Sequence, residues 1–269
     1  MNVFDLFPEN VIYNQILQIY MGMNNGANVV FKIKGDTMKE ICFLNSIDSP
    51  YVVKSLGIGR LNSISGIMTE YANGGDLFDF LFNSYDPRRY DSDYLITIIY
   101  QIALGIRDIH RTGVFHRNIK PENIVLRKEG GEGEDVRAMI IDFEKAIRYD
   151  QHVFEYGTKQ YCPPEMDQKT PLTMAADIYA FGVCILLILI PDIGRIPKFE
   201  DFETFMNQKS TAFPRLNPLK KILAGIFVDD PNNRITIDEI VAFELFDMMK
   251  PFMFDKTLRE ENIHMFYED

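Results

Sequence analysis

The sequence predicts an α+β fold with a small, β-rich N-terminal part and a larger, mostly helical C-terminal part. Two β-rich runs, residues 16–23 and 28–34, flank an Asn-Gly turn, which is the pattern of a β-hairpin. Residues 93–113 carry apolar side chains three and four positions apart and end at a glycine, as an amphipathic helix does. From residue 172 onward the pattern is again mostly helical.

The remaining N-terminal elements follow from the same periodicities. Residues 38–47 have the spacing of a short helix, and residues 51–61 and 65–71 are strand-like. The Gly-rich stretch 73–76 breaks the pattern and predicts a hinge between two parts of the molecule. Further along, two short apolar runs, 123–126 and 138–142, are separated by a polar, Gly-rich stretch.

Composition limits the classes of function. With 269 residues, 46% of them apolar, the chain can bury the core of one large domain or of two lobes. A formal net charge of −11 argues against nucleic acid as a partner and disfavours an anionic membrane surface. The longest apolar run, residues 183–190, is too short to span a bilayer and predicts a buried core helix.

The cysteines and the first ten residues indicate in which cellular compartment the protein is expected. Cys42, Cys162 and Cys184 are odd in number and form no CxxC pair, so neither a disulfide framework nor a structural zinc site is expected. Residues 1–10 have no basic start and no apolar run, so no signal peptide is expected. We expect a reducing, cytoplasmic location, with delivery into a host cell by a virus or a secretion system as an open alternative.

Five segments carry a family resemblance, and they occur in the family's order. They are HRNIKPEN (116–123) with IIDFE (140–144), GTKQYCPPE (157–165), AADIYAFGVCILLIL (175–189) and DPNNRITIDEIV (230–241). Together they resemble the eukaryotic protein kinase family, in its Ser/Thr branch. The resemblance implies a bilobal kinase-like fold in one domain, with an N-lobe at residues 1–72 and a C-lobe at residues 73–269.

The resemblance also implies a site for ATP with Mg²⁺ or Mn²⁺. Asn123 and Asp142 match the family's metal ligands, and Lys120 would neutralise the transferring phosphate. Both Lys32 and Lys34 could be the family's strand lysine. Side chains alternate along a strand, so choosing Lys34 would turn the charge of Lys32 toward the adenine, and we therefore choose Lys32. Its partner would be Glu40.

Other matched positions concern the adenine pocket and the framework. Thr69 falls at the gatekeeper position, and Val30 would pack on the adenine. Glu70 to Ala72 would offer backbone groups to the adenine edge, and Asp76 could reach a ribose. The framework set resembles the family's buried ion pair, its catalytic-loop anchor and its core histidine: Glu165, Arg234, Asp177 and His116.

Four departures from the family pattern point toward impaired chemistry. Asn118 replaces the catalytic aspartate, and an amide cannot accept a hydroxyl proton near neutral pH. No glycine occurs in residues 7–17, where the phosphate loop should be. Few residues separate Lys32 from Glu40, which puts that ion pair in question. Glu144 replaces the flexible glycine of the family's DFG motif, and its carboxylate could ligate a cation or repel a triphosphate.

Three functions remain open from the sequence. The first is a pseudokinase that binds ATP and a divalent cation and acts as a scaffold or regulator through a protein partner or another component of a kinase pathway. The second is an active Ser/Thr kinase, as Lys120 and Thr158 suggest, with Asn118 an engineered substitution or with a remodelled phosphate lid. The third is a protein-binding module that ignores nucleotide. Phosphorylation is poorly supported as a regulator, although Arg117 would be the usual receiver of a phosphate.

Overall fold

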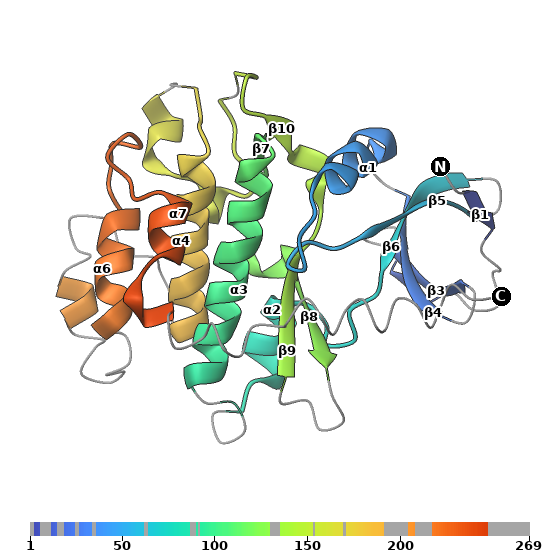
Figure 1. The fold of residues 1–269 in the computed structure, drawn as a ribbon, viewed down its shortest axis with the longest axis horizontal. Helices are drawn as coiled ribbons and strands as arrows, with labels where there is room; N and C mark the ends of the chain where they lie inside the picture. The colour runs from blue at the N-terminus through green and yellow to red at the C-terminus, as the bar shows by residue number, and fades with distance from the viewer. Residues whose placement is uncertain are drawn as a thin grey trace.

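The computed structural model describes residues 3–5, 12–14, 19–24, 27–33, 36–61, 64–86, 90, 92–129, 135–152, 154–168, 171–190, 204–207 and 217–246. They form a small lobe built on a β-sheet and a larger, mostly helical lobe (Figure 1). The predicted α+β bilobal fold is therefore confirmed.

The small lobe is a six-stranded sheet with the strand order β1-β5-β6-β4-β3-β2. The strands are β1 (Val3–Asp5), β2 (Ile12–Asn14), β3 (Ile19–Asn24), β4 (Ala27–Lys32), β5 (Ser55–Leu61) and β6 (Ile64–Glu70). All pairings are antiparallel except that of β1 with β5. The predicted hairpin strands are present, because β3 pairs antiparallel with β4 up to the partners Asn24 and Ala27. The Asn-Gly pair between them lies outside the described residues.

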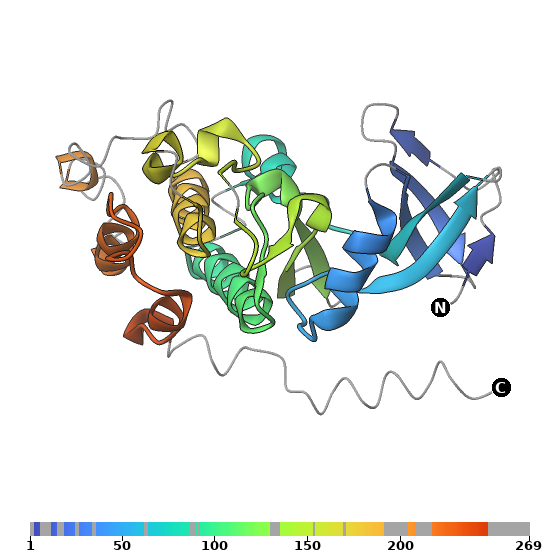
Figure 2. The same ribbon diagram turned by 90° about the horizontal axis from the view of Figure 1, so that it is seen from above.

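One helix, α1 (Thr37–Ser46), packs on this sheet and lies on the side that faces the large lobe (Figure 2). It begins only a few residues after β4 because Asp36 caps it, accepting a hydrogen bond from the Lys39 amide at 3.1 Å. Its buried face carries Glu40, Ile41, Phe43 and Leu44. A polar cap therefore lets a short connection turn directly into a helix, which places Glu40 close to the end of β4.

The large lobe is organised around the helices α3 (Ser92–Arg111) and α4 (Ala175–Leu189), which pack against each other. α6 (Asn217–Ile226) packs on α4, and α7 (Ile237–Val241) packs on α3. A single turn of helix, α2 (Leu77–Asp79), continues as a π-helical segment, η2 (Phe80–Ser84). Short 3₁₀ turns connect these elements: η3 (Pro121–Asn123), η4 (Phe143–Lys145), η5 (Lys159–Tyr161), η6 (Pro164–Gln168) and η9 (Glu244–Phe246).

The predicted core helix is buried on nearly every side. α4 contains most of the apolar run 183–190, and Val183, Ile185 and Leu186 are inaccessible to solvent. Such a helix needs apolar neighbours all round, which α3 and α6 supply. Among the described residues, no helix has the length and apolar character required to cross a membrane.

Two further antiparallel strand pairs pack against α3 through β9 and β7. β8 (Ile124–Glu129) pairs antiparallel with β9 (Asp135–Ile140), and β7 (Val114–Phe115) pairs with β10 (Ile147–Arg148). The two apolar runs predicted from the sequence are thus the two strands of one hairpin. Both strands extend into the polar stretch that was expected to separate them.

The connection between the lobes runs beside β8. The Gly74 amide donates to the Leu126 carbonyl at 2.7 Å, and the Leu126 amide donates to the Gly75 carbonyl at 2.8 Å. A Cβ atom on Gly74 would lie 2.4 Å from the Leu126 carbonyl oxygen, so only glycine permits this approach. The Gly-rich stretch 73–76 therefore follows β6, as predicted, and backbone hydrogen bonds hold it against β8. The division at residues 72 and 73 stays a prediction.

Candidate functional site

Lys32, the last residue of β4, lies at the centre of a cluster of carboxylates. Its ammonium nitrogen is 3.1 Å and 3.3 Å from the two carboxylate oxygens of Glu40 on α1. It also forms an ion pair with Asp142 and lies 3.9 Å from a carboxylate oxygen of Glu144. The structure thus brings Lys32, Glu40 and Asp142 together from three separate elements. The short connection after β4, which put the Lys32–Glu40 pair in question, does not prevent it.

The charges in this cluster shift one another's pKa values. Burial alone would lower the pKa of Lys32, but Asp142 and Glu40 outweigh burial and raise it. Burial raises the pKa of Glu40, and Lys32 offsets part of that effect. For Asp142, burial acts to raise the pKa, but the charge and hydrogen bond of Lys32 lower it overall. At neutral pH the cluster therefore holds a charged lysine against an ionised aspartate.

Asn118 sits beside this cluster and is 5% exposed. Its amide nitrogen donates to a carboxylate oxygen of Asp142 at 3.2 Å, and its amide oxygen accepts from the Thr158 hydroxyl at 3.2 Å. Its backbone carbonyl accepts from the Asn123 side chain at 2.9 Å. Asn118 therefore joins Asp142, the predicted metal ligand Asn123 and the segment around Thr158.

Asn123 and Lys120 lie in the loop between β7 and β8. The Asn123 carbonyl accepts from the Ile141 amide at 3.0 Å, which fixes Asn123 next to the residue before Asp142. The ammonium of Lys120 lies 3.9 Å from a carboxylate oxygen of Glu122. Among the described residues, no group of three or more histidine, cysteine, aspartate or glutamate side chains has the arrangement of a metal site.

Glu144 belongs to η4 and does not adopt a left-handed backbone conformation. The backbone conformation at Glu144 therefore does not require glycine, because any L-residue adopts helical backbone angles. The backbone carbonyl of Glu144 accepts from the Lys39 ammonium at 3.2 Å, which ties the turn to α1. In contrast, Arg117 and Asp142 have φ values of 65° and 70°, which are costly for residues other than glycine and are held by the surrounding contacts.

His116 is fully buried and its contacts define its protonation state. Its Nε2 lies 3.1 Å from the Ile141 carbonyl, which can only accept, and its Nδ1 accepts from the backbone N–H of Asn118 at 3.2 Å. The ring also makes an edge contact with Phe143. The neutral Nε2–H tautomer fits both hydrogen bonds, and burial lowers the pKa of His116. This agrees with a core histidine rather than a base.

Asp177, near the start of α4, anchors the backbone of the loop that carries Asn118, as expected. It accepts from the amides of His116 and Arg117, both at 2.8 Å, and from the Tyr156 hydroxyl at 3.0 Å. His110 on α3 completes the set at 3.1 Å. Burial by itself would raise the pKa of Asp177, but these donors lower it. Four hydrogen bonds to one carboxylate therefore fix the loop that carries Asn118.

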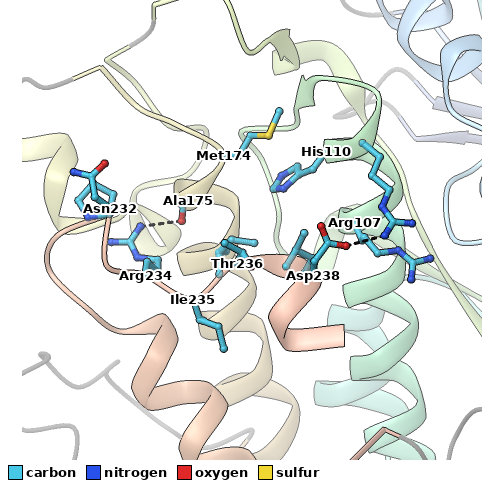
Figure 3. Close-up of a pocket in the computed structure, with 13 residues that line it drawn as sticks. Arg107, His110, Met174, Ala175, Asn232, Arg234, Ile235, Thr236 and Asp238 are labelled. Atoms are coloured by element: carbon cyan, nitrogen blue, oxygen red, sulfur yellow. Dashed lines mark hydrogen bonds and ion pairs between the residues drawn. The ribbon is translucent and has the colours of Figure 1, made fainter. Parts of the chain in front are cut away.

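His110 also lines a cavity of about 460 Å³. Figure 3 shows its wall formed by the end of α3, the start of α4 and the segment around Arg234 and Asp238. None of the nucleotide or metal residues predicted from the sequence lines this cavity. It is thus separate from the Lys32 cluster and connected to the loop that carries Asn118 through the hydrogen bonds of His110 and Asp177.

Hydrogen bonds of Arg117 hold the segment after η4 in place. Arg117 donates to the carbonyls of Glu155, at 2.6 Å and 3.2 Å, and Lys145, at 3.1 Å. The Gly157 amide donates to the Arg117 carbonyl at 2.8 Å. Tyr156, one of the segment's few phosphorylatable residues, is buried, and burial raises the pKa of its hydroxyl well above the ordinary value. The arginine expected to receive a phosphate is therefore engaged by backbone carbonyls.

The residues expected to contact adenine lie next to a salt bridge between Glu70 and Arg127, which was not predicted from the sequence. Arg127 on β8 lies 2.8 Å from a carboxylate oxygen of Glu70 and 3.0 Å from the Tyr71 carbonyl. Ala72 is buried. The carboxylate of Asp76 accepts from the Asp79 amide at 2.8 Å as the cap of α2. Asp76 therefore has a structural role at this position, and its predicted contact with a ribose stays a prediction. Thr69 pairs with Val30 across β6 and β4.

The framework ion pair is present as expected. Arg234 makes two hydrogen bonds to the carboxylate of Glu165, at 2.7 Å and 2.8 Å, and both side chains are almost completely buried. Arg234 also donates to the carbonyls of Ala175 and Val228. A single arginine thereby joins η6, the start of α4 and the loop before α7.

Some expectations fall outside the described residues. Of residues 7–17, where the phosphate loop was sought, the structure describes Ile12–Asn14 as β2, and Lys34 is not among the described residues. Arg127, His110 and Tyr156 were not recognised from the sequence as interaction partners. Nothing in their local pattern announces a contact with a residue many positions away.

The fold and the cluster define a class of protein. A β-rich lobe, a helical lobe and a Lys–Glu–Asp cluster between them are the arrangement of a protein kinase. The sequence matches the model of the protein kinase domain family over residues 27–246. The chain belongs to this family.

Named relatives are similar at modest identity. Serine/threonine-protein kinase SRK2E of Arabidopsis thaliana is 28% identical over 246 residues, covering 84% of this chain and 65% of the relative. Serine/threonine-protein kinase ULK1 of Homo sapiens is 25% identical over 224 residues, covering 78% and 21%. Serine/threonine-protein kinase pkn2 of Myxococcus xanthus is 26% identical over 185 residues, covering 65% and 21%. The chain thus spans between 21% and 65% of the length of these relatives.

Proposed function

We propose that this chain is a kinase-like domain that binds ATP and transfers its phosphate poorly or not at all. The observation that carries the proposal concerns Asn118. Lys32, Glu40 and Asp142 lie together in one cluster, while Asn118 at its edge has an amide in place of a proton acceptor. Phosphoryl transfer needs both parts, and general-base assistance contributes about 10²–10⁴-fold to rate.

Lys32 and the backbone of residues 70–72 support nucleotide binding. When a triphosphate binds, the ammonium of Lys32 would contact its oxygens, with Glu40 holding the ammonium in place. Glu70 to Ala72 would present backbone groups to the adenine edge. For Mg²⁺ or Mn²⁺ to accompany the nucleotide, Asn123 and Asp142 would have to hold it, and the contact between the Asn118 side chain and Asp142 would have to open. Lys120 would face the terminal phosphate.

The function is then carried out through protein partners. A kinase-like domain that binds ATP without turnover can act as a scaffold, as a competitor for another kinase's partners, or as a regulator switched by nucleotide. The net charge of −11 argues against nucleic acid as the partner. We propose the same two lobes, residues 1–72 and 73–269, as the units between which nucleotide would bind.

A thermal shift experiment tests nucleotide binding. ATP that binds the folded state raises the melting temperature through linkage, by an amount set by its concentration relative to Kd. We expect a rise with ATP for the unsubstituted chain and none for Lys32→Met. If millimolar ATP leaves the melting temperature unchanged in the presence and absence of Mg²⁺ and of Mn²⁺, the nucleotide-independent binding module becomes the better proposal.

A second candidate is an active Ser/Thr kinase, which the assembled Lys32–Glu40 pair favours. Radiolabelled phosphotransfer by the chain and by Asn118→Asp separates the two. Activity only in the aspartate form supports the proposal, because the remaining site is then competent. Clear labelling of a substrate by the unsubstituted chain, with contaminating kinases excluded, would overturn it.

A further inference from the structure

The orientation of the Asn118 side chain is fixed by its two neighbours. The Thr158 hydroxyl lies 3.2 Å from the amide oxygen, and Asp142 lies 3.2 Å from the amide nitrogen. The opposite orientation would set the amide oxygen against a carboxylate that can only accept. Asn118 therefore presents an N–H donor to Asp142, which an aspartate at this position could not do.

The charge balance around Asp142 makes this donor important. Three carboxylates, those of Glu40, Asp142 and Glu144, surround the one ammonium of Lys32 within 4 Å. An aspartate at position 118 would add a fourth carboxylate in contact with Asp142. Close carboxylates repel each other in a partly buried site, and a divalent cation between them relieves that repulsion.

Both oxygens of Asp142 already have donors. Lys32 contacts Oδ1 and the Asn118 amide contacts Oδ2. The amide thus occupies the oxygen that a divalent cation would have to use. The residues suit a nucleotide phosphate at Lys32, but they do not leave Asp142 free as a ligand.

We propose that the Asn118 amide takes the place of a divalent cation at Asp142, so that the site is stable and binds nucleotide without one. In the part concerning nucleotide, this inference rests on the proposed function. The part concerning the nucleotide-free protein stands on the Asn118–Asp142 contact alone. Its consequence is a domain whose nucleotide occupancy follows the concentration of the nucleotide itself and not that of Mg²⁺.

The first test uses the chain without nucleotide. Melting temperatures of the unsubstituted chain and of Asn118→Asp are compared in a chelator and in millimolar Mg²⁺. We expect no effect of Mg²⁺ on the unsubstituted chain. Asn118→Asp should melt at a lower temperature in the chelator and recover part of the loss in Mg²⁺, because the cation separates the new carboxylate from Asp142.

A matched control exists elsewhere in the chain. Asn83 donates its amide to the carboxylate of Asp79 at 2.8 Å, in an exposed position. Asn83→Asp makes the same chemical change in water, where the repulsion is screened. It should therefore change the melting temperature little and respond to Mg²⁺ far less than Asn118→Asp.

Asn118→Ala covers the case in which Asn118→Asp does not fold. It removes the donor without adding charge and leaves one oxygen of Asp142 open to a cation. Mg²⁺ should then stabilise Asn118→Ala more than the unsubstituted chain. Equal Mg²⁺ responses of the unsubstituted chain and of the two Asn118 variants would overturn the inference, as would an Asn118→Asp protein that is equally stable in chelator.

The second test titrates a fluorescent ATP analogue in chelator and in Mg²⁺. The Kd of the unsubstituted chain should change by no more than a small factor, whereas Mg²⁺ should tighten binding to Asn118→Asp by roughly tenfold or more. A strong Mg²⁺ requirement in the unsubstituted chain would contradict the inference. If neither protein binds the analogue, the proposed nucleotide site is wrong, and the melting comparison still decides the role of the amide.

Discussion

The ammonium nitrogen of Lys32 lies 3.1 Å from a carboxylate oxygen of Glu40, eight positions further along the chain. The pair forms because α1 starts almost at once after β4 and points its buried face, with Glu40, at the end of that strand. The Phe143 amide also donates to Glu40 at 3.1 Å, which ties α1 to the segment after Asp142. The ion pair lies within the small lobe, and the contacts of its two members with Phe143 and Asp142 join that lobe to the large one.

Lys32→Met should destabilise the protein as well as remove the contact for phosphate. It leaves Glu40 and Asp142 partly buried without their cation, and such groups cost about 1–3 kcal/mol each when left unsatisfied. We expect a lower free energy of unfolding in urea denaturation. Adding Glu40→Gln should restore part of the loss, because one buried charge is then removed. An unchanged urea midpoint for Lys32→Met would show that the pair contributes nothing to stability.

The elements that the sequence predicted well are those whose signal is local. The hairpin around the Asn-Gly turn, α1 and the long helix α3 follow from turn chemistry and apolar spacing within a few residues. The choice of Lys32 over Lys34 also rested on local strand alternation; it stays a prediction, and Lys32 contacts Glu40 and Asp142. Each of these needs no knowledge of distant parts of the chain.

The contacts that the sequence did not predict join distant residues. Arg127 reaches Glu70 across 57 positions, and Arg117 reaches the Glu155 carbonyl across 38. A backbone carbonyl has no sequence signature, so the carbonyls that hold Arg117 could not be read in advance. The short connection before α1 suggested that Lys32 and Glu40 would not pair. They do pair, because the cap at Asp36 starts α1 within a few residues of β4.

Glu165→Gln should be among the more damaging single substitutions in the large lobe. It leaves the buried charge of Arg234 without its counter-charge, and breaking a buried ion pair costs about 3 kcal/mol or more. Asp238→Asn is the matched control, because its pair with Arg111 is 2.9 Å long but about 60% exposed. That control should cost at most about 1 kcal/mol. Equal losses of unfolding free energy for the two variants would contradict the buried role of Glu165.

Gly157→Ala should loosen the segment that covers Asn118. The new methyl carbon would lie 2.3 Å from the Asn118 amide oxygen and 2.7 Å from the Arg117 carbonyl, so the backbone must move. We expect a loss of about 1–3 kcal/mol and faster proteolysis near residues 154–162. Gly225→Ala on α6 meets the Ile235 side chain at 3.1 Å and gains helix propensity, so it should be nearly neutral. Unchanged protease resistance of Gly157→Ala would argue against tight packing over Asn118.

His116 makes stability depend on pH in a defined direction. Its ordinary pKa is 6.5, and burial lowers the pKa in the folded state, although Asp177 and Asp142 act the other way. Above the ordinary value neither state is protonated, so the full stability is present. As the pH falls below about 6.5, the unfolded chain takes up a proton that the folded chain refuses, and the free energy of unfolding falls by up to about 1.4 kcal/mol per pH unit.

Urea denaturation of the unsubstituted chain and of His116→Asn between pH 7.5 and about pH 5.5 measures this dependence. The asparagine variant should be less stable at neutral pH, because it loses the contact with Phe143. Its stability should also fall less steeply with decreasing pH, because the linked proton is gone. Parallel slopes would mean that His116 is protonated in the folded state, which the hydrogen bond from the backbone N–H of Asn118 to its Nδ1 does not allow.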